Sequence, residues 1–275
     1  MQKTFCPPVI VNKRITITDP LHTNLHTHTT FCDGKNTPEE MVRAALEKGM
    51  TCIGFSGHSY VADDPTVGMR PEQEAAYRAE IARLREVYRD RITIYCGLEL
   101  DYETELKDRS PYDYFIGSVH YFRTSAGIAA VDASPQVFEE AVRNGFGNDF
   151  YRAAGAYFEL VSDVVRKTDC DIIGHFDLIT KFNEQGHFFD EEDPRYVAAW
   201  QHAVDKLIPE GRIFEINTGA VARGLRTRAY PSLSILKYIR ERGGRFLLSS
   251  DSHDTGSLGC QFEAYAGFLE GNPCP

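Results

Sequence analysis

Short apolar runs alternate along the chain with stretches in which apolar residues recur at helical spacing. The apolar runs predict seven strands, over 23–29, 51–59, 91–101, 112–121, 170–177, 212–219 and 245–253. The stretches between them predict helices over 37–49, 71–90, 193–209 and 231–244, with a mostly helical insert over about 134–167. The strands are apolar on both faces, which suits a parallel sheet covered on both sides. The alternation therefore predicts an α/β fold, either a barrel related to the TIM fold or an open doubly wound sheet.

The first predicted helix carries start and stop signals that place its ends. Thr37 is a suitable N-cap, Pro38 follows at the first helical position, and Glu40 completes a capping box. Gly49 suits the C-terminal end, where a left-handed backbone is common.

No repeat, low-complexity tract or linker divides the chain, so residues 1–275 are predicted to form one domain. Residues 1–22 are interpreted as an N-terminal extension before the first core strand. This segment carries prolines and charges where a signal peptide has an apolar region. No stretch has the roughly 18 apolar residues of a membrane span.

The net charge and the cysteines limit the classes of binding partner and the cellular compartment that we expect for this protein. The formal net charge of −10 disfavours nucleic acid as a partner, whereas a small anionic substrate is compatible with a local cluster of metal ions. The seven cysteines are odd in number and lack a C-x-x-C spacing, which indicates a reducing, cytoplasmic environment. Cys52, Cys96 and Cys170 lie in apolar runs and are predicted to be inert core residues.

Metal-capable side chains gather at the C-terminal ends of the predicted strands. Because strand side chains alternate, His26 and His28 point the same way and form a chelate geometry. Six of the seven strands end in such residues, namely His26, His28, His58, Glu99, His120, His175, Asp251 and His253. Active sites of parallel barrels lie at that end, so the pattern predicts a metal site there.

Asp33 is a ninth candidate ligand, although "CDG" also suits an Asx-turn that orders the following loop. A zinc-like ion uses three or four protein ligands, so nine ligands with bridging carboxylates suffice for two or three divalent ions. Such a cluster can hold a bridging hydroxide and clamp phosphoryl oxygens. His22, His187 and His202 lie outside the strand ends and are interpreted as surface or core residues.

The ordered motifs "NLHTHTTFCDG", "FSGHS", "GLELD", "GSVH", "GHFD", "EINTG" and "SDSH" resemble the polymerase-and-histidinol-phosphatase (PHP) family over almost the whole chain after residue 22. The resemblance implies a distorted TIM-like (β/α)7 barrel with a trinuclear site of zinc, manganese or iron at the C-terminal ends of the strands. It implies three ligand sets, one for each ion. The first set is His26, His28, Glu99 and Asp251. In the second set Glu99 acts as a bridge together with His120 and His175, and the third set is Asp33, His58 and His253.

Within the family, "GSVHYF", "GHFDLITKFN" and "EINTG" are most similar to stand-alone histidinol-phosphate phosphatases. This similarity implies hydrolysis of L-histidinol phosphate in histidine biosynthesis. The expected mechanism is direct attack on phosphorus by a metal-bound hydroxide, without a phosphoenzyme. Asp33, His58, Glu99 and His253 are the expected catalytic residues, and the donor of the proton to the leaving group stays open.

Substrate contacts are expected from residues just past the strands. Arg223 is the first candidate for phosphate, with Arg226 and Arg228 as competitors and Lys181 as a further cation. Asn217 ends the one strand without a metal ligand and is expected to line the pocket or to bond the backbone. Acceptors for the substrate's ammonium and imidazole groups are sought among three residues, Asp177, Glu215 and Tyr121.

Other functions are compatible with the same ligands. A related phosphoesterase could act on another small phosphorylated metabolite or a nucleotide. A metal-dependent amidohydrolase would want a bridging lysine at a strand end, and Lys181 lies too far beyond His175. A degenerate, non-catalytic barrel should have lost ligands, yet every expected position is filled. The oligomeric state stays open.

Overall fold

The computed structural model describes residues 7–124, 127–184 and 187–270, and a seven-stranded parallel sheet forms its centre. The strands follow one another in chain order: β3 (Thr23–Asn24), β4 (Cys52–Phe55), β5 (Thr93–Asp101), β6 (Tyr114–Ser118), β9 (Ile172–Ile173), β10 (Ile213–Asn217) and β11 (Arg245–Ser249). Just past the ends of β3 and β11, Thr27 and Ser252 form a parallel bridge. The sheet thus curls into a nearly closed barrel, which confirms the barrel rather than the open sheet.

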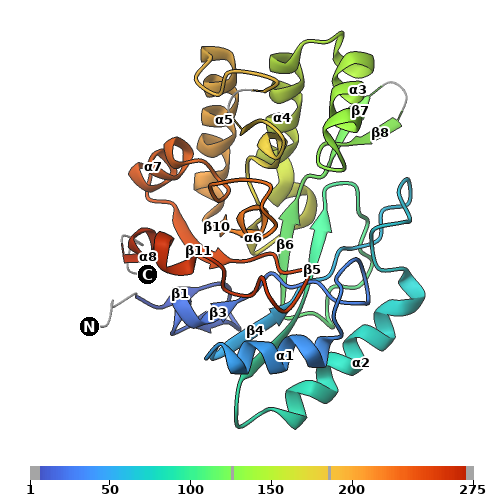
Figure 1. The fold of residues 1–275 in the computed structure, drawn as a ribbon, viewed down its shortest axis with the longest axis vertical. Helices are drawn as coiled ribbons and strands as arrows, with labels where there is room; N and C mark the ends of the chain where they lie inside the picture. Colours follow the sequence, from blue (N-terminus) through green and yellow to red (C-terminus); the bar gives the residue numbers. More distant parts are fainter. Residues whose placement is uncertain (1–6, 125–126, 185–186, 271–275) are drawn as a thin grey trace.

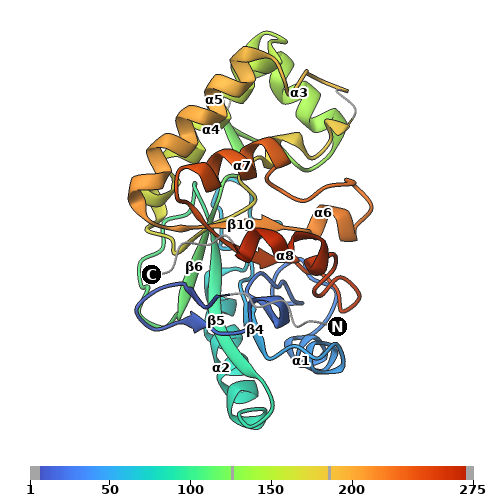
Figure 2. The ribbon, with the colours of Figure 1, turned by 90° about the vertical axis from the view of Figure 1, so that its left-hand side faces the viewer.

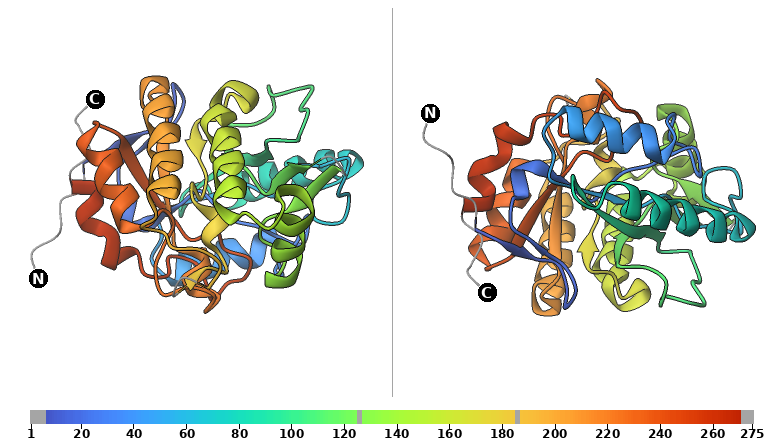
Figure 3. Two further views of the ribbon diagram at one scale, coloured as in Figure 1. Left: turned by 90° about the horizontal axis from the view of Figure 1, so that it is seen from above. Right: turned by 90° about the horizontal axis from the view of Figure 1, so that it is seen from below.

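Helices surround the strands and alternate with most of them. They are α1 (Pro38–Glu47), α2 (Pro71–Val87), α3 (Pro135–Phe146), α4 (Phe150–Thr168), α5 (Pro194–Leu207), α6 (Gly219–Ala222), α7 (Leu233–Glu241) and α8 (Phe262–Glu270). Figures 1 and 2 show α3, α4 and α5 together at one end of the molecule and α1 and α2 towards the other. Figure 3 shows α1 and α2, in blue and teal, on a different side of the strands from α5, in orange. The insert predicted over 134–167 forms α3 and α4.

The predicted ends of α1 are confirmed. The Thr37 side chain accepts a hydrogen bond from the Glu40 backbone, and the Glu40 carboxylate accepts one from the Thr37 backbone at 2.8 Å. Gly49 follows the helix with a φ of +73°. The cap fixes where the loop from the first strand enters the helix, and this loop carries Asp33.

Several predicted strands are longer than the observed ones, and several elements were not predicted. The strands predicted over 23–29 and 170–177 reduce to two residues each, because the chain leaves the regular ladder where the metal-capable residues begin. The run predicted over 112–121 ends at Ser118, and a hairpin of β7 (Tyr121–Thr124) and β8 (Gly127–Ala130) follows it. Helix α8 and an N-terminal hairpin were also missed.

The N-terminal hairpin, formed by β1 (Val9–Ile10) and β2 (Thr16–Ile17), closes the barrel at the end opposite the metal-capable residues. Its buried side chains Val9, Val11, Ile15 and Ile17 form one apolar cluster with inward-facing strand residues, namely Leu25, Cys52, Tyr114, Ile116, Ile172, Ile213 and Leu247. Burial of these side chains removes apolar surface from water. These side chains also fill the half of the barrel nearest the N-terminal hairpin, so that the polar residues occupy the opposite half.

Two glycines make room for the Tyr114 ring across the barrel interior. A Cβ at Gly97 would lie 2.4 Å from the ring, and one at Gly54 would lie 2.4 Å from its hydroxyl oxygen. That hydroxyl donates a hydrogen bond to the Leu25 carbonyl. The Tyr114 ring therefore separates the apolar half of the barrel from Glu99, which lies two residues after Gly97 on β5.

Cys52, Cys96 and Cys170 are buried free thiols, as predicted. Among the described residues, no helix is both long enough and apolar enough to cross a membrane.

Candidate metal centre

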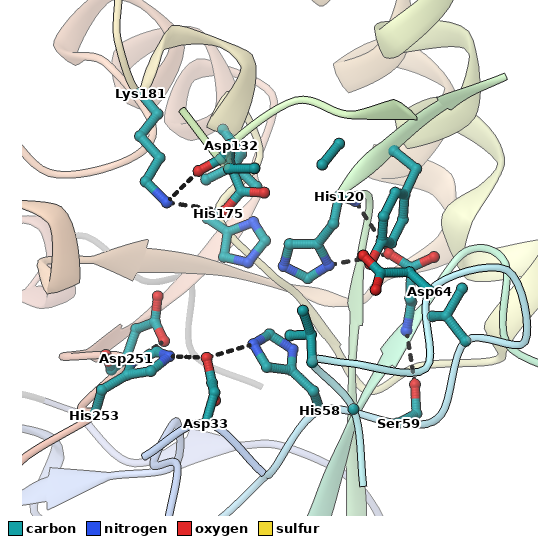
Figure 4. Close-up of a pocket in the computed structure, with 18 of the residues that line it drawn as sticks. Asp33, His58, Ser59, Asp64, His120, Asp132, His175, Lys181, Asp251 and His253 are labelled. Atoms are coloured by element: carbon teal, nitrogen blue, oxygen red, sulfur yellow. Dashed lines mark hydrogen bonds and ion pairs between the residues drawn. The ribbon is translucent and has the colours of Figure 1, made fainter. Parts of the chain in front are cut away.

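All nine predicted ligands converge at the C-terminal end of the barrel. They lie on or just past six of the seven strands, and six of them are labelled around one pocket in Figure 4. The side chains of His26, His28 and Glu99 are fully buried, and that of Asp251 is 8% exposed. His22, His187 and His202 lie elsewhere, at or near the surface, in agreement with the prediction.

The first ligand set surrounds a point between four buried side chains. The Nε2 atoms of His26 and His28 lie 3.2 and 3.5 Å from Glu99 Oε2, and 3.6 and 3.1 Å from Asp251 Oδ1. Ligand atoms of a tetrahedral zinc ion, each about 2.0–2.1 Å from it, lie about 3.3 Å apart. Among the described residues, neither Nε2 atom has a hydrogen-bond partner. Buried polar atoms normally have partners, so these residues fit a metal ion.

Glu99 links the first set to the second. Its Oε1 atom lies 2.9 Å from His175 Nε2 and 3.5 Å from His120 Nε2, and it accepts a hydrogen bond from Ser118 at 2.6 Å. Its Oε2 atom also lies 2.9 Å from His58 Nδ1. The two carboxylate oxygens thus face different groups of imidazoles, which suits the predicted bridging position.

The third set is the most open to solvent. His253 Nε2 lies 3.0 Å from Asp33 Oδ2, and His58 Nε2 lies 3.7 Å from the same oxygen (Figure 4). His28 Nδ1 lies 3.4 Å from Asp33 Oδ1, so His28 stands between the first and third sets. The Asp33 carboxylate faces imidazoles, which favours a ligand over the Asx-turn alternative.

The charges within the centre are tightly coupled. Burial lowers the pKa of His26, but Glu215, Glu99 and Asp251 more than offset it and raise that pKa well above its usual range. Burial also lowers the pKa of His120, but the nearby Glu99 carboxylate more than offsets this effect and raises that pKa to about 9. The pKa of Glu99 is held well below its usual range despite burial, because His26 and other imidazoles surround it. Without metal, the positive charges of protonated imidazoles therefore balance the negative charges of these carboxylates.

Zinc loading is therefore expected to release protons near pH 7, because His26, His28 and His120 are protonated there and must be neutral to bind metal. Titration calorimetry of the metal-free protein in buffers of different ionisation enthalpy should show a release of about two to three protons. The release should shrink as the pH rises through the pKa of His120, about 9. His120→Gln should lower the count, whereas His202→Gln, at a half-exposed position, should not. A buffer-independent heat would contradict this expectation.

Two further carboxylates lie against the second ring nitrogen, Nδ1, of two histidine ligands. Glu215 Oε1 lies 2.5 Å from His26 Nδ1, and Asp101 Oδ2 lies 3.0 Å from His120 Nδ1. A carboxylate on the second ring nitrogen fixes the tautomer of a metal-binding histidine. Asp101 was missed, although period two on β5 places it on the same face as Glu99.

Three residues expected to contact substrate lie away from the cavity. Glu215 and Asn217 are fully buried on β10, where the Asn217 amide donates to Glu215 Oε2 at 2.9 Å and to Asp251 Oδ2 at 3.3 Å. Asp177 is also buried and accepts a hydrogen bond from the Ser232 backbone. Asn217 also accepts a hydrogen bond from the Gly219 backbone at 2.9 Å, which agrees with the expected alternative of a bond to the backbone. The expected substrate contacts of Glu215 and Asp177 are corrected, because Glu215 lies beneath the ligands and Asp177 is enclosed in the core.

Removing the charge of Glu215 is expected to weaken metal binding more than it alters the fold. Glu215→Gln should lower zinc affinity about 10- to 100-fold, the usual effect of losing a carboxylate behind a histidine ligand. Competition with a chromophoric chelator measures this, with circular dichroism as the check on folding. Glu210→Gln, an exposed change just before β10, is the matched control. Equal affinities in both variants would contradict a positioning role for Glu215.

A cavity of about 410 Å³ opens above the centre. Asp33, His58 and His253 line its floor, while Arg223, Lys181 and Tyr121 line its walls. Arg223 donates to the Asp251 carbonyl at 3.0 Å, and its side chain is 28% exposed. Lys181 donates to the Asp132 carboxylate at 2.9 Å, so its charge is already balanced and its phosphate contact stays a prediction.

The two competing arginines do not reach this cavity. Arg226 is buried, with its guanidinium 4.8 Å from the centre of the Tyr230 ring and donating to Thr180. Arg228 is exposed and is not part of the cavity wall. Arg223 is therefore the candidate that the fold favours.

The PHP-domain family model matches residues 24–219 of this chain. A protein of Deinococcus radiodurans named "Probable histidinol-phosphatase" is 32% identical over 247 residues, which cover 86% of this chain and 88% of that protein. The histidinol-phosphatase of Bacillus subtilis is 27% identical, with 87% of this chain and 96% of that protein covered.

Two solved structures share the fold. HisK from Listeria monocytogenes has a TM-score of 0.79 and 21% identity, covering 88% of this chain and 99% of that one. The histidinol phosphate phosphatase of Lactococcus lactis, in complex with zinc, L-histidinol and phosphate, has a TM-score of 0.65 and 20% identity, covering 90% and 92%.

Proposed function

The chain belongs to the PHP-domain family, and from that premise we propose that it hydrolyses L-histidinol phosphate to L-histidinol and phosphate. The observation that carries the proposal is the convergence of nine ligands, including the buried carboxylate of Glu99, beneath a cavity with Arg223 in its wall. The names of the curated relatives supply the substrate, and the described site is consistent with it.

The three ligand sets support up to three divalent ions. Groups of side chains whose ligand atoms lie within 4.8 Å of one another overlap these sets without matching them: His28, Asp33, His58 and His253; His26, His28 and Asp251; His58, Glu99 and His120. The mixture of imidazole and carboxylate ligands suits zinc, and manganese and iron are the alternatives. When bound, such ions lower the pKa of a water molecule and neutralise phosphoryl oxygens.

The protein's own residues position the phosphoryl group and shield the site. Arg223 can present a planar pair of donors to phosphate oxygens, which a lysine cannot. We assign the catalytic roles to Glu99 and to three residues that line the cavity floor, Asp33, His58 and His253. Asp101 and Glu215 keep His120 and His26 in the tautomer that leaves Nε2 free.

An amidohydrolase is less consistent with the site than a phosphatase. That chemistry wants a lysine among the metal ligands, but Lys181 Nζ donates to the carbonyl and carboxylate of Asp132. We place the reaction in histidine biosynthesis in the cytoplasm, with a small phosphomonoester as the only partner proposed.

Phosphate release from a panel of phosphomonoesters tests the proposed function. The zinc-loaded or manganese-loaded protein should prefer L-histidinol phosphate by orders of magnitude in kcat/KM. Weak activity of similar size on every compound of the panel would contradict the substrate assignment and favour another phosphorylated metabolite or a nucleotide as the substrate. A protein without bound metal or turnover would indicate a binding barrel instead.

A further inference from the structure

One carboxylate in the cavity wall has no cationic partner. Six aspartates line the cavity: Asp33, Asp64, Asp101, Asp132, Asp251 and Asp254. Five of them lie against a cation or an imidazole. The pairs are Asp33 with His253, Asp101 with His120, Asp132 with Lys181, Asp251 with Arg223, and Asp254 with Lys35. Within the described part of the chain, Asp64 alone among the six makes no ion pair.

The Asp64 carboxylate is nevertheless held in place, entirely by neutral donors. Its Oδ1 atom accepts hydrogen bonds from the Thr66 hydroxyl at 2.6 Å and the Thr66 backbone at 3.3 Å. Its Oδ2 atom accepts one from the Tyr121 hydroxyl at 3.1 Å. The hydrogen bond from the Thr66 hydroxyl is the largest cause of a lowered pKa of Asp64, so the group is ionised at neutral pH.

Asp64 lies across the cavity from Lys181. Figure 4 shows it beyond His120, on the side of the pocket away from Lys181 and His253. The same wall contains Val61 and Val67, and the Val67 side chain is partly exposed. The cavity thus has the ion pair of Lys181 and Asp132 on one side and, across the ligands, an anionic position beside apolar surface.

We infer that Asp64 forms the subsite for the ammonium group of the substrate. The inference rests on the proposed function, because L-histidinol phosphate carries a phosphate and, on the neighbouring carbon chain, a primary ammonium. A preorganised carboxylate without a cation is suited to that group, since a charge-assisted hydrogen bond is stronger than a neutral one. The sequence-based candidates, Asp177 and Glu215, are buried with other partners, and Tyr121 instead positions Asp64.

The test compares two phosphates that differ only in the amine. They are L-histidinol phosphate and 3-(imidazol-4-yl)propyl phosphate, each assayed with wild type and Asp64→Asn as zinc-loaded protein. Asn keeps the shape of the side chain and removes its charge. For L-histidinol phosphate, Asp64→Asn should lower kcat/KM about 10- to 100-fold, mainly through KM, as expected for losing a hydrogen bond to a charged group. For the phosphate without the amine, kcat/KM should change less than about threefold.

The neighbouring Asp63 offers a matched control, because it is exposed and is not part of the cavity wall. Asp63→Asn makes the same charge change in the same turn and should leave both substrates unaffected. An equal loss on both substrates, or no loss on either, would overturn the subsite. Wild-type protein that is active but indifferent to the amine would overturn it while leaving a phosphatase. Wild-type protein inactive on both would overturn the proposed function and this inference with it.

Discussion

Replacing Glu99 by glutamine is expected to lower kcat/KM for L-histidinol phosphate by about a thousandfold or more and to reduce the bound metal. Glu99 is 1% exposed, and its two oxygens lie within 3.5 Å of five imidazoles, those of His26, His28, His58, His120 and His175. A neutral amide cannot bridge two cations as a carboxylate does. Metal ions supply several kcal/mol of transition-state stabilisation, which corresponds to about three orders of magnitude in rate.

Metal content by elemental analysis and kcat/KM by phosphate release should fall together in Glu99→Gln. Glu105→Gln, an exposed change just past the same strand, controls for the loss of a negative charge. Circular dichroism separates loss of metal from loss of fold. Full turnover with a full complement of metal in Glu99→Gln would rule out the central position assigned to this residue.

Replacing Arg223 by alanine is expected to lower kcat/KM about 100- to 1,000-fold, the usual effect of removing a donor that stabilises charge in the transition state. Its guanidinium lies beside the centre, 3.0 Å from the Asp251 carbonyl and 3.1 Å from His253 Nδ1. Inhibition by inorganic phosphate should weaken as well. Arg223→Lys should recover only part of the loss, because an ammonium lacks the planar pair of donors.

Arg228→Ala is the matched control, since it removes the same charge from the same segment at an exposed position outside the cavity. Metal content must be measured in both variants, because Arg223 also contacts the Asp251 carboxylate at 3.4 Å. If Arg223→Ala loses metal but keeps its sensitivity to phosphate, Arg223 supports the ligand Asp251 and does not contact phosphate.

The sequence alone determined a parallel α/β fold and the nine candidate ligands, and its resemblance to the PHP family favoured a barrel over an open sheet. The α/β class and most of the ligands follow from local rules: apolar runs buried on two faces predict parallel strands, and ligands at strand ends meet at one edge of a sheet. The same rules failed at the lengths of the short strands β3 and β9. There, metal-capable residues interrupt the ladder, and tertiary contacts rather than propensity hold the backbone.

The tertiary structure alone decided which polar residues face the cavity and which lie beneath it. Glu215 and His26 are 189 residues apart in the chain and meet only because β10 and the segment after β3 cross the same barrel interior. Arg223 and Arg226 are three residues apart, yet one faces the cavity and the other is buried against Tyr230. Asp64 has no sequence signature, since its lack of a cation depends on where every other charge in the cavity lies. Residue type and spacing therefore predict which atoms can bind metal, whereas partners brought together from distant parts of the chain decide the remaining roles.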